Sequence, residues 1–257
     1  MLLRLAGPLQ SWGERSAFSP MRDTASFPTR SALIGMFCAA QGLARDESEA
    51  ELNRCAGLEF TIRIDRPGTR MIDYHTVGGG LPKQLTAATS GGDHKGNAVI
   101  TRRHYLADAV FTIAVTGADD DIARIAAALH QPYWAPYLGR RSCVPDEPFL
   151  LRASVDDPVR ELMERVPLSR PAAGEHPLSS EAPHIPVAFL WERYPHPQLP
   201  DDAVTLTAND VPISFAQHGR SHGKRRLHRT TEPLAVTLRG DQATLYQRLI
   251  DYAKKDT

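Results

Sequence analysis

The sequence predicts an α+β fold, because segments with the spacing of strands alternate along the chain with segments that have the spacing of helices. Residues 2–6 and 107–116 are apolar runs of strand length, and residues 57–65 alternate between apolar and polar side chains. Residues 31–42 and 119–130 instead repeat apolar side chains at helical spacing. The order strand, helix, strand, long arm, strand, helix suits a ferredoxin-like unit of the kind found in RNA-recognition domains.

The composition is ordinary for a globular protein with one large domain or two small ones. The chain has 257 residues, of which 42% are hydrophobic and 23% charged, and its formal net charge is zero. The neutral total gives no hint of nucleic acid, although it can hide local basic patches. We expect a ferredoxin-like domain over residues 1–150, with an arm at about 76–105, and a loop-rich region over 151–257 with short strands and a terminal helix.

Several classes of protein are excluded by what the sequence lacks. No run of about 18 apolar residues predicts a membrane span, and Pro8 interrupts an N-terminal apolar run that is already too short for a signal peptide. We therefore expect a cytoplasmic protein. The three cysteines, Cys38, Cys55 and Cys143, form no CxxC pair, so buried reduced thiols are expected, with no metal and no cofactor.

A polar loop over residues 7–28 follows the first predicted strand. A strand, a long decorated loop and a helix in this order suggest that the loop contacts a partner. The helix over 31–42 has Ser31 or Thr29 as its N-cap and Gly42 as its C-cap. Its first turn offers free N–H groups to an anion. The candidate contacts here are Trp12, Arg15, Arg30 and Ser31.

The middle of the chain is predicted to contain a second helical segment at 45–54 and then the alternating strand at 57–65. Six glycines follow within residues 76–100, a region with little to build a core, which indicates a long flexible loop or hairpin arm. Three aspartates begin the helix at 119–130, where they favour its positive end. The alternation places Leu58, Phe60, Ile62 and Ile64 on one face of the strand and Glu59, Thr61, Arg63 and Asp65 on the other.

The last hundred residues are predicted to be rich in loops. Eight prolines lie between residues 165 and 200, with one short strand at 185–192. Further short strands are expected at 203–207, 211–215 and 233–240. The terminal helix turns Leu245, Leu249 and Tyr252 inward.

Three basic segments are candidates for RNA contact, because arginine binds phosphate and aromatic rings stack on bases. The segment ITRRHYL puts two guanidinium groups beside two rings, and YWAPYLGRRSCVPDEP has three aromatic residues before an arginine pair. In the second segment the rings can instead pack the core, with the arginines paired to Asp146 and Glu147. The run at 217–229 reads as a basic glycine-containing loop without acids, although such runs are also common on merely solvated surfaces.

The sequence motifs give little support to an enzymatic function. The sequence has no Walker motif, no GxGxxG before a helix, no HExxH and no GxSxG. A metal-free ribonuclease would have to use scattered side chains as acid and base. The candidates are Tyr74, His75, His94 and His104.

Five segments together resemble the CasD family, the Cas-five-type subunits of the type I-E CRISPR surveillance complex, Cascade. They are LRLAGPLQSWG, FPTRSALIGMFCAAQGLAR, DYHTV, ITRRHYLADAVFTIAV and PYLGRRSCVPDEP, which occur in family order within about residues 1–150. The resemblance implies an RRM-like fold with an extended β-hairpin thumb that folds over the guide RNA. It also implies a non-catalytic subunit, active in antiviral defence, that caps and grips the 5′ handle of the CRISPR RNA.

The resemblance also implies partners and contacts. The partners are the CRISPR RNA, the backbone subunit, the large subunit and, indirectly, target DNA. A related subtype uses the corresponding subunit as an endoribonuclease, which leaves metal-independent cleavage of repeat RNA as the alternative, and a purely structural adaptor as a third reading. The motif residues expected to contact RNA are Trp12, Arg15, Arg30, Ser31, Arg102, Arg103, Tyr105, Tyr137, Arg140 and Arg141, to which the basic run adds Arg220, Lys224, Arg225 and Arg226 on charge alone.

Overall fold

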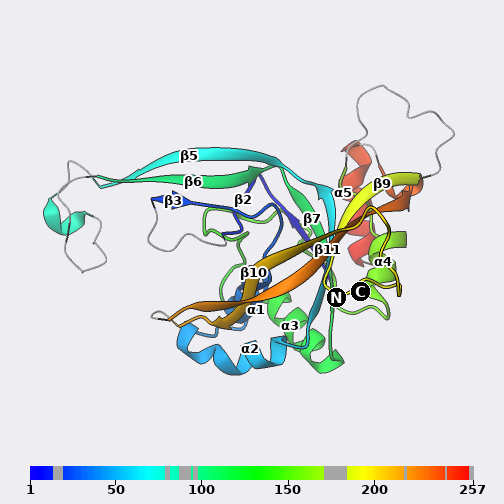
Figure 1. Ribbon diagram of the computed structural model, residues 1–257, viewed down its shortest axis with the longest axis horizontal. Coiled ribbons are helices and arrows are strands. Elements are labelled where there is room, and N and C mark those ends of the chain that lie inside the picture. Colours follow the sequence, from blue (N-terminus) through cyan, green and yellow to red (C-terminus); the bar gives the residue numbers. More distant parts are fainter. Residues whose placement is uncertain are drawn as a thin grey trace.

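The computed structural model describes residues 1–13, 20–78, 82–86, 94, 98–170, 184–216, 219–240 and 242–254. It confirms the α+β class. Two antiparallel-rich sheets and a set of short helices make up the described chain (Figure 1). The helices are α1 (Arg30–Ala40), α2 (Glu49–Cys55), α3 (Asp119–His130), α4 (Pro158–Glu164) and α5 (Gln242–Ala253), with 3-10 turns at Arg45–Glu47, Lys83–Leu85 and Val236–Leu238.

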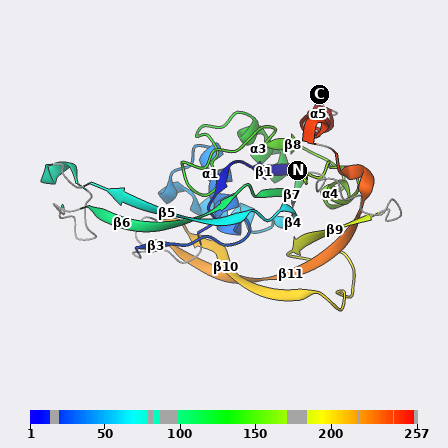
Figure 2. The same ribbon diagram turned by 90° about the horizontal axis from the view of Figure 1, so that it is seen from above.

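The main sheet has seven strands in the order β10-β11-β9-β4-β7-β1-β8, and every neighbouring pair is antiparallel. It contains strands from both sides of residue 150. Four of its strands and two helices occur along the chain in the order β1, α1, β4, β7, α3 and β8, with other elements between them. This order is β-α-β-β-α-β. Figure 2 shows how β9, β10 and β11 curl away from the rest of the sheet. The strands are β1 (Leu2–Ala6), β4 (Glu59–Arg66), β7 (Val110–Thr116), β8 (Leu150–Arg152), β9 (His184–Trp191), β10 (Val204–Ser214) and β11 (Ser221–Ala235).

Both faces of the main sheet are covered, so the protein has two apolar cores. One face packs against α1, α2 and α3, where Leu5, Phe60 and Phe111 lie. The other face packs against α4 and α5, where Phe189 and Trp191 stack 5.1 Å apart. The strand predicted over 57–65 is β4, and three of its polar alternate residues, Thr61, Arg63 and Asp65, are buried as well, because α4 covers that face.

The buried polar face of β4 is organised around Arg63 and Asp65. The Arg63 side chain is 0% exposed and makes two hydrogen bonds to the Asp65 carboxylate, at 2.7 and 3.1 Å. Its remaining N–H groups donate to the carbonyls of Leu162, Val166 and Pro167, at the end of α4. This pair therefore ties α4 to the sheet through bonds that leave no free donor on the guanidinium group.

The arm is a second, smaller sheet that extends from the main body (Figure 1). Its two long strands, β5 (Thr69–Val77) and β6 (Val99–Ala107), pair over nine positions, from Thr69 opposite Ala107 to Val77 opposite Val99. The short strands β2 (Leu9–Gln10) and β3 (Met21–Arg22) pair with the other edge of β6. The predicted hairpin arm is confirmed, although it begins at Thr69, and much of its glycine-rich tip lies outside the described residues.

The strand predicted over 107–116 begins only at Val110. Asp108 has a φ of +57°, which breaks the chain into β6 and β7. This left-handed residue turns the backbone from the arm into the main sheet, because aspartate tolerates the conformation better than most side chains. The same apolar run therefore serves two different sheets.

The C-terminal predictions need several corrections. The two short strands predicted at 203–207 and 211–215 form one strand, β10, and residues 221–229 of the basic run form the start of the long strand β11 rather than a loop. Residues 233–240 hold only the end of β11 and a 3-10 turn. Helix α4 was not predicted, although Asp157 caps it and Pro158 opens it, which is a standard start signal. The strand near 185–192 and the terminal helix are confirmed as β9 and α5.

The cysteines are confirmed as buried thiols without a disulfide. Burial raises the pKa of Cys38 to about 12, and burial also raises the pKa of Cys55 and Cys143. At neutral pH these groups are protonated and poor nucleophiles.

Among the helices of the described chain, none has the length and apolar character needed to span a bilayer.

Candidate nucleic-acid interface

Three segments that are distant in the sequence meet at the base of the arm. Strand β3 pairs in parallel with β6, which places Arg22 beside Arg103, and the amide of Arg102 donates to the carbonyl of Pro20 at 2.9 Å. The turn that contains Arg140 reaches the same place, since its Nη2 donates to the carbonyl of Arg22 at 3.1 Å. The fold thus gathers several arginines around one short stretch of strand.

Strand geometry separates the two arginines of ITRRHYL. Successive side chains of a strand point to opposite faces, so Arg102 and His104 lie on one face of β6, and Arg103 and Tyr105 on the other. The expectation that both guanidinium groups and both rings lie side by side is therefore wrong. We call the first surface the Arg102 face, and the second, together with Thr101 and Arg140, the Arg103 face.

The Arg103 face presents two guanidinium groups in fixed positions. Arg140 lies over the buried ring of Tyr105, with its central carbon 4.6 Å from the ring centre. Arg103 is held at its base by a 3.2 Å hydrogen bond from Nε to the hydroxyl of Thr101. Such stacking and hydrogen bonding orient a cation without neutralising its charge. Asp73 lies opposite Arg103 on β5, and its carboxylate is 3.6 Å from the ring of His75.

One nitrogen of Arg140 is left without a partner. Its Nη1 is buried and has no hydrogen-bond acceptor among the described residues. A buried N–H group without an acceptor costs about 1–3 kcal/mol, more when the group is charged. A phosphate oxygen would supply such an acceptor, and guanidinium groups are well suited to phosphate.

The opening loop supports this arginine instead of offering its own ring. Trp12 is 0% exposed, and its indole N–H donates to the side-chain oxygen of Gln10 at 3.1 Å. Ser11 joins the opening loop to β6 and to the turn before Arg140. Its hydroxyl donates to the carbonyl of His104 at 3.0 Å, and its amide donates to the carbonyl of Leu138. Trp12 was expected to contact RNA, and the structure gives it a packing position below the interface.

Gly139 is required at the turn before Arg140. Its φ is +88°, and a Cβ atom added there would lie 1.7 Å from the carbonyl oxygen of Ser11. No side chain fits so close to backbone. The glycine lets the turn pack against the opening loop, and this packing sets the position of Arg140.

The Arg102 face is different in character. Ile72 and Tyr74 from β5 lie on it, each 61% exposed, opposite His104 and Arg102. Ile100 also lies on this face and is exposed, as is Met21, the parallel partner of Arg102. This surface combines two exposed arginines, Arg70 and Arg102, with several large apolar side chains.

Two of the expected RNA contacts are internal. Arg30 donates to the Glu192 carboxylate at 2.8 and 3.0 Å and also to the carbonyls of Cys55, Ala56 and Leu58. Arg225 pairs with Glu192 and with Asp210, the latter through two bonds of 2.7 Å. Their guanidinium groups are thus committed to carboxylates inside the protein.

The remaining expected contacts are spread over the surface. Arg102, Arg141, Arg220, Lys224 and Arg226 are exposed, Tyr137 is just exposed, and Ser31 is partly buried. Arg15 lies outside the described residues. The alternative pairing of Arg140 with Asp146 or Glu147 is not what the structure shows, since the contacts of Arg140 are with Arg22 and Tyr105.

The side chains considered for catalysis are not gathered into one site. Tyr74 and His104 share the Arg102 face, whereas His75 is on the opposite face, beside Asp73. His94 contacts the carbonyl of Thr86 near the tip of the arm, at 2.7 Å. Within the described part of the chain, no group of three or more histidine, cysteine or acidic residues is placed to hold a metal ion.

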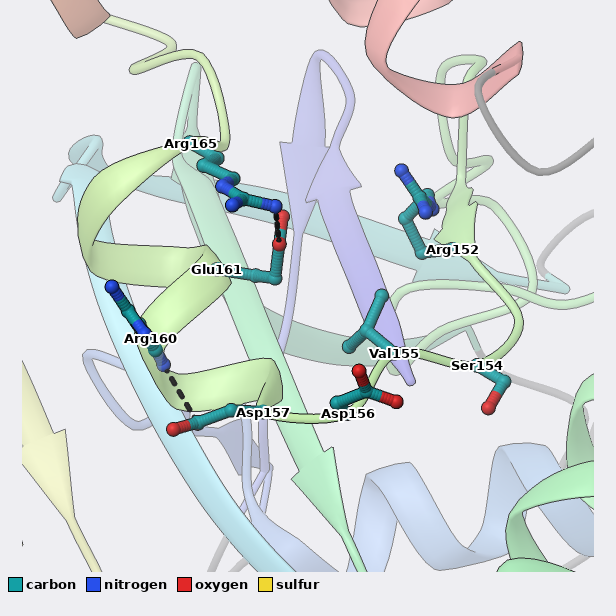
Figure 3. Close-up of a pocket in the computed structure, with 8 residues that line it drawn as sticks. All are labelled: Arg152, Ser154, Val155, Asp156, Asp157, Arg160, Glu161 and Arg165. Atoms are coloured by element: carbon teal, nitrogen blue, oxygen red, sulfur yellow. Dashed lines mark hydrogen bonds and ion pairs between the residues drawn. The ribbon is translucent and has the colours of Figure 1, made fainter.

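Two polar cavities lie away from the arm. One, of about 410 Å³, is formed by the segment after β8 and by α4, and Figure 3 shows its charged lining. Two of its three arginines have acidic partners, since Arg160 pairs with Glu164 at 2.9 Å and Arg165 with Glu161 at 2.6 Å, and the third, Arg152, lies over the ring of Tyr252. The second, of about 460 Å³, lies over the network that joins Arg30, Glu192 and Arg225.

Comparisons with known proteins agree on one family. Residues 1–228 match the family described as CRISPR-associated protein (Cas_Cas5). The chain is 34% identical over 184 residues to the CRISPR system Cascade subunit CasD of Escherichia coli (strain K12). The matched region covers 65% of this chain and 77% of that protein. A chain of a solved CRISPR RNA-guided surveillance complex is 44% identical, with a TM-score of 0.85 and 99% of both chains covered. A crystal structure of a Cas protein matches at 25% identity and a TM-score of 0.61, covering 94% of this chain and 97% of that one.

Proposed function

Because this chain belongs to the CRISPR-associated Cas5 protein family, we propose that it is the subunit of a Cascade complex that binds the 5′ handle of the CRISPR RNA without cleaving it. The observation that carries this proposal is the Arg103 face. Arg103 and Arg140 come from segments far apart in the sequence, both are oriented by neighbouring side chains, and neither guanidinium group forms an ion pair with a carboxylate within the described part of the chain. Preorganised guanidinium groups of this kind are suited to the phosphates of single-stranded RNA.

The arm acts in this proposal as the thumb of the subunit. The β-α-β-β-α-β unit of the main sheet is the ferredoxin-like core, and the pair β5–β6 extends from it over the guide where the handle meets the spacer. Two strands of nine residues are long enough, at about 3.3 Å per residue, to span several nucleotides. The glycine-rich tip allows close approach to RNA backbone.

The Arg102 face serves assembly. Ile72, Tyr74 and Ile100 offer exposed apolar surface, which does not bind phosphate. Exposed apolar patches mark contacts with other proteins. We assign this face to the backbone subunit of the complex and other parts of the surface to the large subunit. The two faces of one thin sheet then join RNA to protein.

Binding and cleavage of repeat RNA separate this proposal from its alternative. Incubating the purified protein with labelled repeat RNA, with and without EDTA, is expected to give a retained complex on filters and intact RNA on a denaturing gel. Binding should weaken for an RNA that lacks the handle, and with rising salt, by a log–log slope of about −0.7 per neutralised phosphate. The separation of His75 from Tyr74 and His104, on opposite faces of the arm, supports the non-catalytic function.

The opposite outcomes are equally clear. Cleavage that is insensitive to EDTA would make the endoribonuclease the leading reading and would direct attention to Tyr74 and His104. Intact RNA without any binding would favour the adaptor reading, in which the basic groups face acidic surfaces of neighbouring subunits.

A further inference from the structure

Two neighbouring aromatic rings protrude from the loop after α3. Tyr133 is 73% exposed and Trp134 is 46% exposed, and the rings meet edge to face with their centres 4.9 Å apart. Large exposed aromatic residues are uncommon on a surface that serves only solubility, whereas tyrosine, tryptophan and arginine are the typical anchors of protein interfaces. The handle-binding surface described above does not use this pair.

The pair is held rigidly by the end of α1. The amide of Tyr133 donates to the carbonyl of Ala40 at 2.9 Å, and the amide of Trp134 to the carbonyl of Ala39 at 3.4 Å. The ring of Tyr133 lies flat over Gly42, where an added Cβ would come within 2.9 Å of the ring. An anchor that is already ordered loses little conformational entropy when a partner binds.

The electrostatic surroundings disfavour phosphate at this position. Helices α1 and α3 both end here, at Ala40 and His130, and helix C-termini carry partial negative charge. The last turn of α1 contains no basic residue, and that of α3 contains only His130. The exposed turn Arg45–Glu47 just beyond Gly42 adds two acids and one base. A cation would therefore be favoured beside these rings.

We propose that Tyr133 and Trp134 dock a protein segment of a neighbouring Cascade subunit that presents a lysine or arginine side chain to the indole ring. A cation over tryptophan is the strongest of the cation–aromatic pairs, and it gains further from the negative helix ends below. The inference rests on the proposed function, because the partner is placed within the same complex. It adds a second protein contact, separate from the Arg102 face of the arm.

Hydroxyl-radical footprinting read by mass spectrometry tests this directly, since both rings are reactive and the peptide that carries them can be followed in any assembly. Three samples are compared: the free protein, the protein with handle RNA, and the complete complex with its CRISPR RNA. Oxidation of Tyr133 and Trp134 is expected to be unchanged by RNA alone and to fall about fivefold in the complex, as exposed rings become interface core. Trp12 and Trp191, both fully buried, are internal references.

Substitutions of Trp134 test the chemistry of the partner. Trp134→Phe keeps an aromatic face, whereas Trp134→Leu keeps only apolar bulk. We expect the leucine variant to enter the complex about tenfold less well than the phenylalanine variant, with equal melting temperatures and equal affinity for RNA.

Each other outcome overturns the inference. Protection by RNA alone would show that the rings stack on bases, and unchanged oxidation in the complex would show that nothing docks there. Equal assembly of the leucine and phenylalanine variants would exclude a cationic partner. If the wild-type protein does not enter the complex at all, the proposed function fails together with this inference, whereas entry without protection removes the inference only.

Discussion

Replacing Arg63 with methionine is expected to lower the free energy of unfolding by about 3–5 kcal/mol. The substitution leaves the carboxylate of Asp65 buried without its paired cation, and the hydroxyl of Thr112 and the amide of Ser169 are then its hydrogen-bond donors among the described residues. It also removes the donors that satisfy three carbonyls at the end of α4. Chemical denaturation followed by tryptophan fluorescence measures the loss.

The matched control for this prediction is Arg160→Met on α4. Arg160 pairs with Glu164 four residues along the same helix, but both side chains are more than half exposed, so we expect a change below about 0.5 kcal/mol. The double variant Arg63→Met, Asp65→Leu should recover part of the stability, because no buried charge remains. A loss for Arg63→Met as small as that of the control would contradict the role given to the buried pair.

Replacing Glu192 with glutamine is expected to cost about 3 kcal/mol of stability. The Glu192 carboxylate lies between Arg30 and Arg225 and also accepts the amide of Phe60 at 2.9 Å. Glutamine keeps the shape but removes the charge, so Arg30 loses its carboxylate partner and Arg225 keeps only Asp210 among the described acidic residues that pair with it. The network joins the start of α1 to β9, β10 and β11, so its loss should loosen the curled part of the sheet.

Hydrogen exchange locates this effect, since amides of β10 and β11 should exchange faster in the variant than those of β1 and β7. Glu164→Gln provides the control, because it removes a carboxylate from an exposed pair. Uniform exchange across both sets of strands, or a stability equal to that of the control, would show that the network does not fasten the curl.

The sequence could predict the elements whose periodicity follows from one buried face. Strand β1 and helices α1 and α3 have such faces, and their predicted spans agree with the structure to within two residues, whereas the span predicted for β7 began three residues too early. The arm shows the opposite case, because both faces of β5 are open to solvent and its residues follow no apolar alternation. Its glycines predicted a loop or hairpin arm in this part of the chain, but nothing local marked Thr69 as its start.

The candidate site was only partly predictable for a similar reason. The residue types of ITRRHYL and GRRS indicated RNA, but which residues share a face depends on strand register, and this separated Arg102 from Arg103. The burial of Arg225 depends on Glu192 and Asp210, which lie elsewhere in the chain. Charge alone cannot distinguish such an internal cation from an exposed one such as Arg226.

If the Arg103 face binds the RNA, the salt dependence of binding must change when its guanidinium groups are removed. Arg103→Gln with Arg140→Gln removes two guanidinium groups from that face. The control Arg102→Gln with Arg160→Gln removes the same charge from the opposite face of the arm and from α4. Affinity for handle RNA is measured for all three proteins over a series of salt concentrations.

The Arg103 and Arg140 variant is expected to bind more weakly, with a log–log slope shallower by about 1.4, which corresponds to two phosphate contacts on single-stranded RNA. The control should keep the slope of the wild-type protein. An unchanged slope in the first variant, or an equal reduction in both, would contradict the account, because the RNA would then lie elsewhere or would respond only to total charge.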